Sequence, residues 1–193
     1  MRKFFVLIFV FAVFFSAVSV QAKTISNDEV IVEVSEEDVN KANEEQIKLY
    51  LDKYNSIKET PTYEYKLEKV GSQTATKVRI GYAANQPKNG TVFASTGGFY
   101  WSDGGNEVSI SISIGYGIFS LSVSPGKPAS SGEYISAPVN KACKLVIHKD
   151  IEVIKYQLYR RPLVAGVGTG NWTYVEDSYT KTPVKHYLSV ETL

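Results

Sequence analysis

One segment of the chain has the hydrophobic spacing of a helix. Ser35 and Asp38 resemble a capping box, in which a serine oxygen accepts hydrogen bonds from free backbone amides at a helix start. Apolar residues then recur about every 3.6 positions, at Val39, Ala42, Ile47, Tyr50, Leu51 and Tyr54. The pattern predicts one amphipathic helix over about 36–54. Its narrow stripe and charged remaining faces indicate packing on the edge of a larger unit.

After Pro61 the pattern changes to short alternating runs separated by Gly, Pro, Asn and Ser. Tyr63 to Leu67 and Val78 to Tyr82 begin a series of strand candidates. The others lie near 98–102, 107–114, 118–124, 133–137, 143–149, 151–159, 171–177 and 184–191. The chain leaves no room for the crossover helices of a parallel sheet. The sequence therefore predicts a mainly β protein, an antiparallel β-sandwich or barrel-like fold of about 8–10 short strands with the one N-terminal helix.

The most regular alternation lies between residues 107 and 124. Val108, Ile110, Ile112 and Ile114 alternate with serines, and Phe119, Leu121 and Val123 do so again after Gly115-Tyr116-Gly117-Ile118. A four-residue loop over 115–118 would pair Ile114 with Phe119, Ile112 with Leu121 and Ile110 with Val123, all on one face. The pattern predicts a β-hairpin. A single strand with a glycine bulge is the alternative.

The hairpin allows two functions. Its aliphatic face can pack on the sandwich core, or it can face lipid while the serines line water in a closed barrel. The candidate membrane-facing residues are Ile110, Ile112, Ile114, Phe119, Leu121 and Val123. Each arm has about seven residues, against the 9–11 that cross a bilayer, and this shortfall favours core packing.

The N-terminus has the pattern of a secretory signal peptide. Arg2 and Lys3 precede an apolar run over 4–15, and Val20 and Ala22 are suited to the −3 and −1 positions of a cleavage site. The run is shorter than the roughly 20 residues that cross a bilayer. We expect a signal peptide over 1–22, cleavage after Ala22, and a secreted, extracellular protein.

Charge divides the remaining chain into two parts. Residues 23–59 carry ten acidic and five basic side chains, and residues 60–193 carry ten acidic and fourteen basic ones. We therefore expect an acidic N-terminal segment over 23–59, which contains the helix, and a β-rich domain over 60–193. The basic excess is too small and too dispersed to indicate nucleic-acid binding.

Cys143 is the lone cysteine, which excludes an intrachain disulfide framework and is typical of a bacterial exoprotein. Its strand-like surroundings predict a buried, inert thiol. His148 and His186 are the candidate imidazole bases, and neither lies in a nucleophile or metal motif. The carboxylate pairs Asp103/Glu107 and Glu176/Asp177 could serve a glycosidase. The sequence predicts no metal site and no cofactor, leaves any catalytic residue unknown, and favours a non-enzymatic protein.

Two groups of residues are candidates for contact with a partner. Aromatic rings beside polar loops can stack on sugar rings, although such rings more often fill a core; these residues are Tyr100, Trp101, Asp103, Asn171 and Trp172. Basic residues over 141–161, among them Lys149 and Lys155, could share a strand face and attract an anionic wall polymer. A solvated lysine-rich edge is the more common meaning of that pattern.

These patterns together favour a secreted binding module that acts by contact with a cell surface, a cell-wall polysaccharide or a surface protein. The alternative is a membrane-active or antibacterial toxin-like protein that uses the 108–123 hairpin, with the segment 23–59 as a prosegment or restraining arm. Membrane contact is expected only under that alternative. A hydrolase with an unrecognised site is the third possibility.

Overall fold

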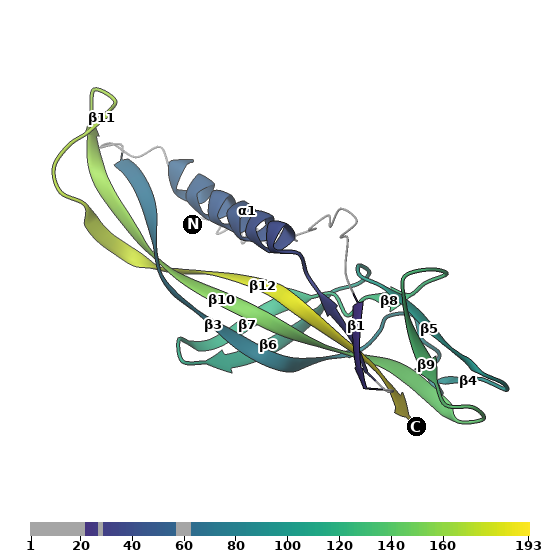
Figure 1. Ribbon diagram of the computed structural model, residues 1–193. Coiled ribbons are helices and arrows are strands. Elements are labelled where there is room, and N and C mark those ends of the chain that lie inside the picture. Colours follow the sequence, from purple (N-terminus) through teal and green to yellow (C-terminus); the bar gives the residue numbers. More distant parts are fainter. Residues whose placement is uncertain (1–21, 27–28, 57–62) are drawn as a thin grey trace, which may run out of the picture.

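The structure is a computed structural model that describes residues 22–26, 29–56 and 63–193 (Figure 1). The predicted signal peptide lies outside the described residues except for Ala22. The fold is mainly β, with several antiparallel sheets and one helix in a sandwich-like arrangement, which confirms the predicted fold class.

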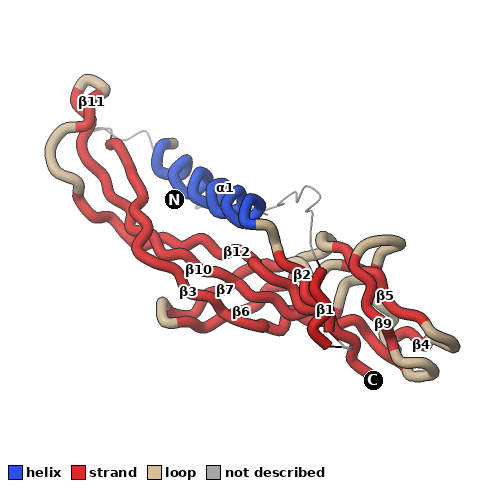
Figure 2. The backbone as a smooth tube through the Cα atoms, in the orientation of Figure 1, coloured by secondary structure: helices blue, strands red, loops and turns tan. Residues whose placement is uncertain are grey.

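Three long strands form the frame of the molecule. β10 (Ala142–Val164) lies between β3 (Tyr63–Tyr82) and β12 (Thr173–Thr192) and pairs antiparallel with both. These strands run along most of the elongated molecule (Figures 1 and 2). Because β10 has a partner on each side, it carries many of the most buried side chains, among them Leu145, Ile147 and Ile151.

Each long strand replaces two of the short strands expected from the sequence. The expected break in β10 falls at Asp150, where the strand continues through register shifts against both neighbours. The opposing Lys77 has a φ of 48°, and its backbone N–H donates to Asp150 Oδ1 at 2.6 Å. A β-bulge of this kind accommodates an extra residue and increases the local twist. The expected break at Asp150 is therefore a bulge within a continuous strand.

The shorter strands complete the sheets. β1 (Ala22–Ser26) pairs with β2 (Glu29–Glu33), and β2 pairs with the end of β12. A separate three-stranded sheet has β5 in its centre, and the remaining pieces are a two-stranded sheet and two short additions to β10. Their bounds are β4 (Thr91–Val92), β5 (Gly97–Ser102), β6 (Val108–Ile114), β7 (Gly117–Val123), β8 (Lys127–Pro128), β9 (Glu133–Ala137) and β11 (Val167–Gly168).

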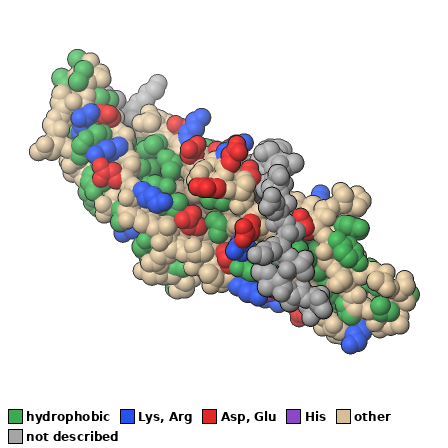
Figure 3. Space-filling model, in the orientation of Figure 1, with side chains coloured by type: hydrophobic (Ala, Val, Ile, Leu, Met, Phe, Trp, Pro, Cys, Tyr) green, Lys and Arg blue, Asp and Glu red, His purple; other side chains and the backbone are tan. Residues whose placement is uncertain are grey.

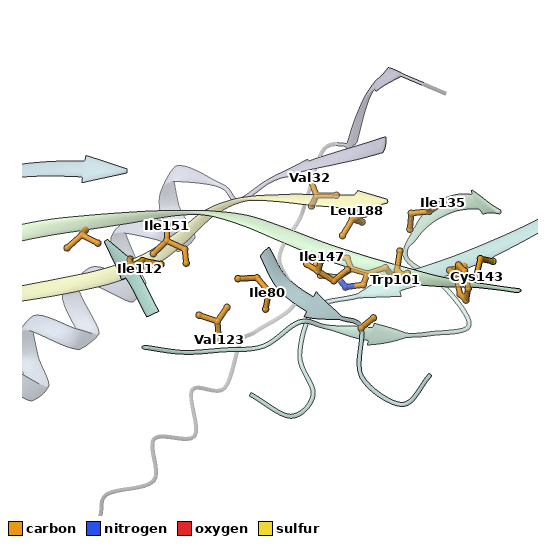
Figure 4. Packing of buried hydrophobic residues seen from close by; sticks show 14 residues of the cluster. Val32, Ile80, Trp101, Ile112, Val123, Ile135, Cys143, Ile147, Ile151 and Leu188 are labelled. Atoms are coloured by element: carbon orange, nitrogen blue, oxygen red, sulfur yellow. The ribbon is translucent and has the colours of Figure 1, made fainter. Parts of the chain in front are cut away.

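The hydrophobic core lies where the long sheet meets the smaller sheets. Ile147 and Ile151 of β10 pack in one cluster with Ile80, Trp101 and Val123 (Figure 4). Cys143 is also fully buried there, as predicted, and its Sγ donates to the carbonyl of Thr91 at 3.3 Å. Burial raises the pKa of this thiol, so it is poorly suited to act as a nucleophile.

The predicted helix is present as α1 (Glu36–Asn55), and Ser35 caps it by accepting from the Asp38 amide at 3.1 Å. The helix lies along β12 next to the stretch that β2 covers (Figure 1). Gln46 donates to the Lys181 carbonyl at 3.3 Å and accepts from the Lys181 amide at 3.0 Å, as a neighbouring strand would. Thr182 donates to Asn43 at 2.8 Å, and the hydroxyls of Tyr50 and Tyr54 donate to Glu176. Polar contacts therefore hold much of α1 on the sheet.

Candidate functional site: the β6–β7 hairpin and its base

The serine-rich segment forms the predicted hairpin, and the alternative of one bulged strand is wrong. β6 and β7 pair along their whole length, from Val108 opposite Val123 to Ile114 opposite Gly117. The loop is only two residues long, Gly115-Tyr116, so the predicted four-residue loop and its pairs are wrong by two positions. Ile112 faces Phe119, and Ile110 faces Leu121. Because the shift is even, the same side chains still share one face.

The aliphatic face of the hairpin packs on the long sheet. Ile112 and Val123 are buried in the same cluster as Ile151 and Val153 of β10. Phe119 lies on the ring of Tyr179 in β12, with 4.8 Å between the ring centroids. The remaining candidate residues are partly buried against this cluster: Ile110, Ile114 and Leu121. In this structure the aliphatic face is therefore core.

The serine face of the hairpin is exposed. Ser109, Ser111 and Ser113 of β6 all face solvent, as do Ser120 and Ser122 of β7. Ile118, which lies opposite Ser113, is 79% exposed. Each arm thus has one mostly apolar, covered face and one solvated face, which is small and polar except at Ile118.

Few bonds tie the hairpin to the rest of the molecule. β6 and β7 form a sheet of their own, and within the described residues neither pairs with a third strand. The Gly115 amide donates to Gln73 Oε1 at 2.8 Å, and Lys181 Nζ donates to the Ser120 carbonyl at 3.4 Å. An open groove runs between β3 and β6. It is lined by Thr74–Thr76 and Val78 of β3 and by residues 111–114 of β6. The hairpin is packed on the sheet without being part of it.

A buried ion pair anchors the base of the hairpin. Asp103, in the loop between β5 and β6, accepts from Lys149 Nζ at 3.3 Å, and Lys149 is only 2% exposed. Burial lowers the pKa of Lys149, and Asp103 opposes that shift. Burial also acts to raise the pKa of Asp103, but Lys149 and His186 outweigh it and leave that pKa below its ordinary value. Lys149 therefore does not belong to the solvated basic face predicted within residues 141–161.

His186 completes this cluster. Its ring lies 5.3 Å from the ring of Trp101, and its Nδ1 is buried without a hydrogen-bond partner among the described residues. Burial and the neighbouring Lys149 lower the pKa of His186 to about 3. The imidazole is thus neutral near pH 7 and has little capacity to act as a base.

The candidate sugar-binding residues lie at two distant places. Trp101 is buried, and its Nε1 donates to the Pro125 carbonyl at 3.1 Å, so it fills the core and has no free ring face. Tyr100 is exposed and packs on Tyr134, with 5.1 Å between the two ring centroids. Asn171 and Trp172 lie between β11 and β12, whereas β5 is near the opposite end of the molecule (Figure 1). The five residues therefore do not form one site.

Among the remaining candidate catalytic groups, His148 has a lowered pKa, and Glu176 and Asp177 have partners of their own. His148 is half-buried in β10, and burial lowers its pKa. Glu176 accepts from Tyr50 and Tyr54, and Asp177 pairs with Lys155 at 2.7 Å. Among the described residues, no three His, Cys, Asp or Glu side chains come together in a way that could hold a metal ion.

Within the described part of the chain, no helix is both long and apolar enough to cross a bilayer. Searches against protein-family models, curated proteins and solved structures found no match to this chain.

Proposed function

We propose that the protein is membrane-active and that the β6–β7 hairpin is the element that inserts into a bilayer. The observation that carries this proposal is the hairpin's separateness. It has the two-faced alternation of a transmembrane barrel wall, and within the described residues its two strands pair only with each other.

Detachment of the hairpin exchanges one apolar environment for another. Ile110, Ile112 and Leu121 would leave the sheet and enter hydrocarbon, so their burial is retained. The cost lies in the surface left behind, where Ile151, Val153 and Tyr179 lose their cover. Burial of an aliphatic side chain contributes about 1.5–3 kcal/mol, so the cost of uncovering these residues is several times that amount. Because few hydrogen bonds tie the hairpin to the sheet, their loss adds little to this hydrophobic cost.

Bilayer geometry sets two further requirements. A lone hairpin leaves both outer strand edges unpaired in hydrocarbon, so several copies must pair edge to edge into a closed barrel. The arms of seven residues are short for a bilayer. Residues 105–107 and 124–126 lie outside the regular strands and adjoin the two arms. If these segments extend the two strands on insertion, each arm has about ten residues. Pro125 would then lie near the end of a strand, where proline is tolerated.

The test is dye release from lipid vesicles by the mature chain, with two matched variants on opposite faces. Leu121→Asp places a charge on the aliphatic face, and Ser122→Asp places the same charge on the exposed face. A charge on the lipid side of a barrel costs up to about 2–4 kcal/mol at mid-bilayer. We expect Leu121→Asp to reduce release at least tenfold and Ser122→Asp to leave it nearly intact. Equal release by both folded variants would refute the proposal.

A labelling experiment covers the case in which Leu121→Asp fails to fold. Single cysteines at 109–113 would carry an environment-sensitive fluorophore, and the buried Cys143 should stay unlabelled in the folded protein. On addition of vesicles, labels at positions 110 and 112 should report hydrocarbon, and labels at 109, 111 and 113 should report water. A signal without this alternation would contradict insertion as a β-hairpin.

Contact with a wall polymer or surface protein is the second candidate function. It is supported by the exposed pair Tyr100 and Tyr134, whose rings lie beside each other on neighbouring strands. Two adjacent exposed rings can stack on a sugar or a partner's apolar surface. Sedimentation with isolated cell walls tests this role. Loss of pelleting in Tyr100→Ala, with the fold retained, is the expected result, and undiminished pelleting contradicts it.

A further inference from the structure

The end of the molecule that carries β11 is apolar and exposed. Residues 162–175 contain no charged side chain, although 21% of the chain is charged. Val164 and Val167, which pair across the turn, are 61% and 65% exposed. Figure 3 shows hydrophobic side chains at this end, with charged side chains next to them. We call residues 162–167 the apolar tip.

The turn of the apolar tip has an unusual residue choice. Ala165 and Gly166 connect Val164 to Val167, and both have positive φ, 50° and 80°. Such two-residue turns favour Asn or Asp before Gly, because an alanine Cβ is strained in the left-handed region. Asn at position 165 would stabilise the turn and make this end of the molecule more polar. An apolar residue is present here although neither turn geometry nor core packing requires it.

A belt of aromatic and cationic side chains follows directly behind the apolar tip. Two cations lie over the ring of Trp172, with Lys66 Nζ at 4.5 Å and the Arg161 guanidinium at 4.6 Å from its centroid. Arg160 lies over the ring of Tyr63 at 4.5 Å. Tyr174 is half exposed beside Tyr159. Glu64 pairs with Arg161 and Glu68 pairs with Lys66, each at 2.6 Å, so the excess positive charge of the belt lies at Arg160.

This order of chemistry along one axis matches the layers of a bilayer surface. Aliphatic side chains suit the upper hydrocarbon region, while tryptophan and tyrosine prefer the interface and arginine pairs with phosphate. Arg160 is exposed, so its guanidinium is available to a phosphate oxygen. A sugar partner would explain the rings but has no need of an uncharged aliphatic tip beyond them, and a protein partner does not require tip, rings and cations in this order.

We propose that the apolar tip and the belt behind it form a docking site for phospholipid headgroups. This inference rests on the proposed membrane function but uses other residues. Docking at the tip would also bring the hairpin loop towards the membrane. The loop residue Tyr116 lies next to Gly71 of β3, and the arm of β6 lines the groove beside Val78, which lies further along β3. Since β3 starts at Tyr63 beside the tip, the hairpin loop points towards the docked end (Figure 1).

The test is sedimentation of the mature chain with phosphatidylcholine vesicles, with and without anionic lipid. We expect the double variant Val164→Asp/Val167→Asp to lower the fraction bound about tenfold, since both side chains are exposed and the fold should persist. Val92→Asp, an equally exposed valine at the opposite end, should bind like the wild type. Arg160→Ala should weaken binding mainly to anionic vesicles, and that part should vanish in high salt.

Trp172 gives a second readout that does not depend on a substitution in the tip. Its emission should shift to the blue with vesicles and be quenched by brominated lipid, while a Trp172→Phe variant, which retains only the buried Trp101, should show no shift. Binding of the Val164→Asp/Val167→Asp variant at the wild-type level would overturn the proposal. So would wild-type protein that pellets with cell walls or a purified surface protein but not with vesicles.

The docking site and the hairpin proposal can fail separately. Wild-type pelleting that is lost in the tip variant, without dye release by any protein, supports docking and refutes the hairpin function. Dye release by the tip variant at the wild-type level, with undiminished pelleting, refutes docking and leaves the hairpin function standing.

Discussion

The buried ion pair at the hairpin base gives the sharpest prediction about stability. Asp103→Asn keeps the size of the side chain and removes its charge, so the ammonium of Lys149 stays buried without its partner. Removal of one member of a buried pair costs about 3–5 kcal/mol. The Asp103 side chain is 27% exposed, and water that reaches it reduces the penalty, so we expect about 3 kcal/mol. For a protein of this size that corresponds to a fall in Tm of roughly 6–12 °C.

The assay is thermal and urea unfolding followed by circular dichroism, with an exposed ion pair as the control. Glu68→Gln breaks the pair with Lys66, which is as short as 2.6 Å but lies in solvent, and should cost at most about 1 kcal/mol. The double variant Asp103→Asn/Lys149→Met should recover much of the loss, because an apolar side chain suits the buried position. Should Asp103→Asn melt within 2 °C or so of Glu68→Gln, the anchoring role is wrong.

Two further predictions concern His186 and α1. Because the pKa of His186 falls from its ordinary 6.5 to about 3 on folding, the unfolded chain binds the proton more readily. Stability should therefore drop by about 1.4 kcal/mol per pH unit below pH 6.5 until about pH 3, and His186→Phe should flatten this slope in urea titrations. Gln46→Ala removes both bonds to the Lys181 backbone and should cost about 1–2 kcal/mol while speeding proteolysis within α1. Glu45→Ala, an exposed neighbour, is the control, and equal cleavage of both variants would contradict the docking by Gln46.

Local patterns in the sequence predicted the elements that local forces determine. The capping box and spacing of α1 and the alternation of β6 and β7 are each set by neighbouring residues, and both elements formed. The hairpin register was wrong by two positions because a period of two fixes the face of a side chain without fixing its partner. Loop length decided the register, and Gly115-Tyr116 close the loop alone.

The long strands and the buried cluster depend on residues far apart in the sequence. Asp150 suggested a strand end, yet hydrogen bonds from Lys77 and Tyr187 satisfy its carboxylate within a bulge. Lys149 looked like a surface residue because its partner, Asp103, lies in a distant loop. Alternation already offered a signal: Lys149 shares its strand face with Ile151 and Val153. Its place in an alternating series with two aliphatic residues is the sequence signal that it is buried.

The three long strands also make the molecule mechanically continuous. β10 reaches from Cys143, which pairs with β4 at one end, to Val164 beside the tip at the other. Within the described residues no linker separates these ends, so no hinge absorbs a displacement between them. We expect the molecule to unfold in one cooperative transition despite its elongated shape. A force applied at the tip would be transmitted to the core along continuous strands, so we expect the molecule to resist bending between its two ends.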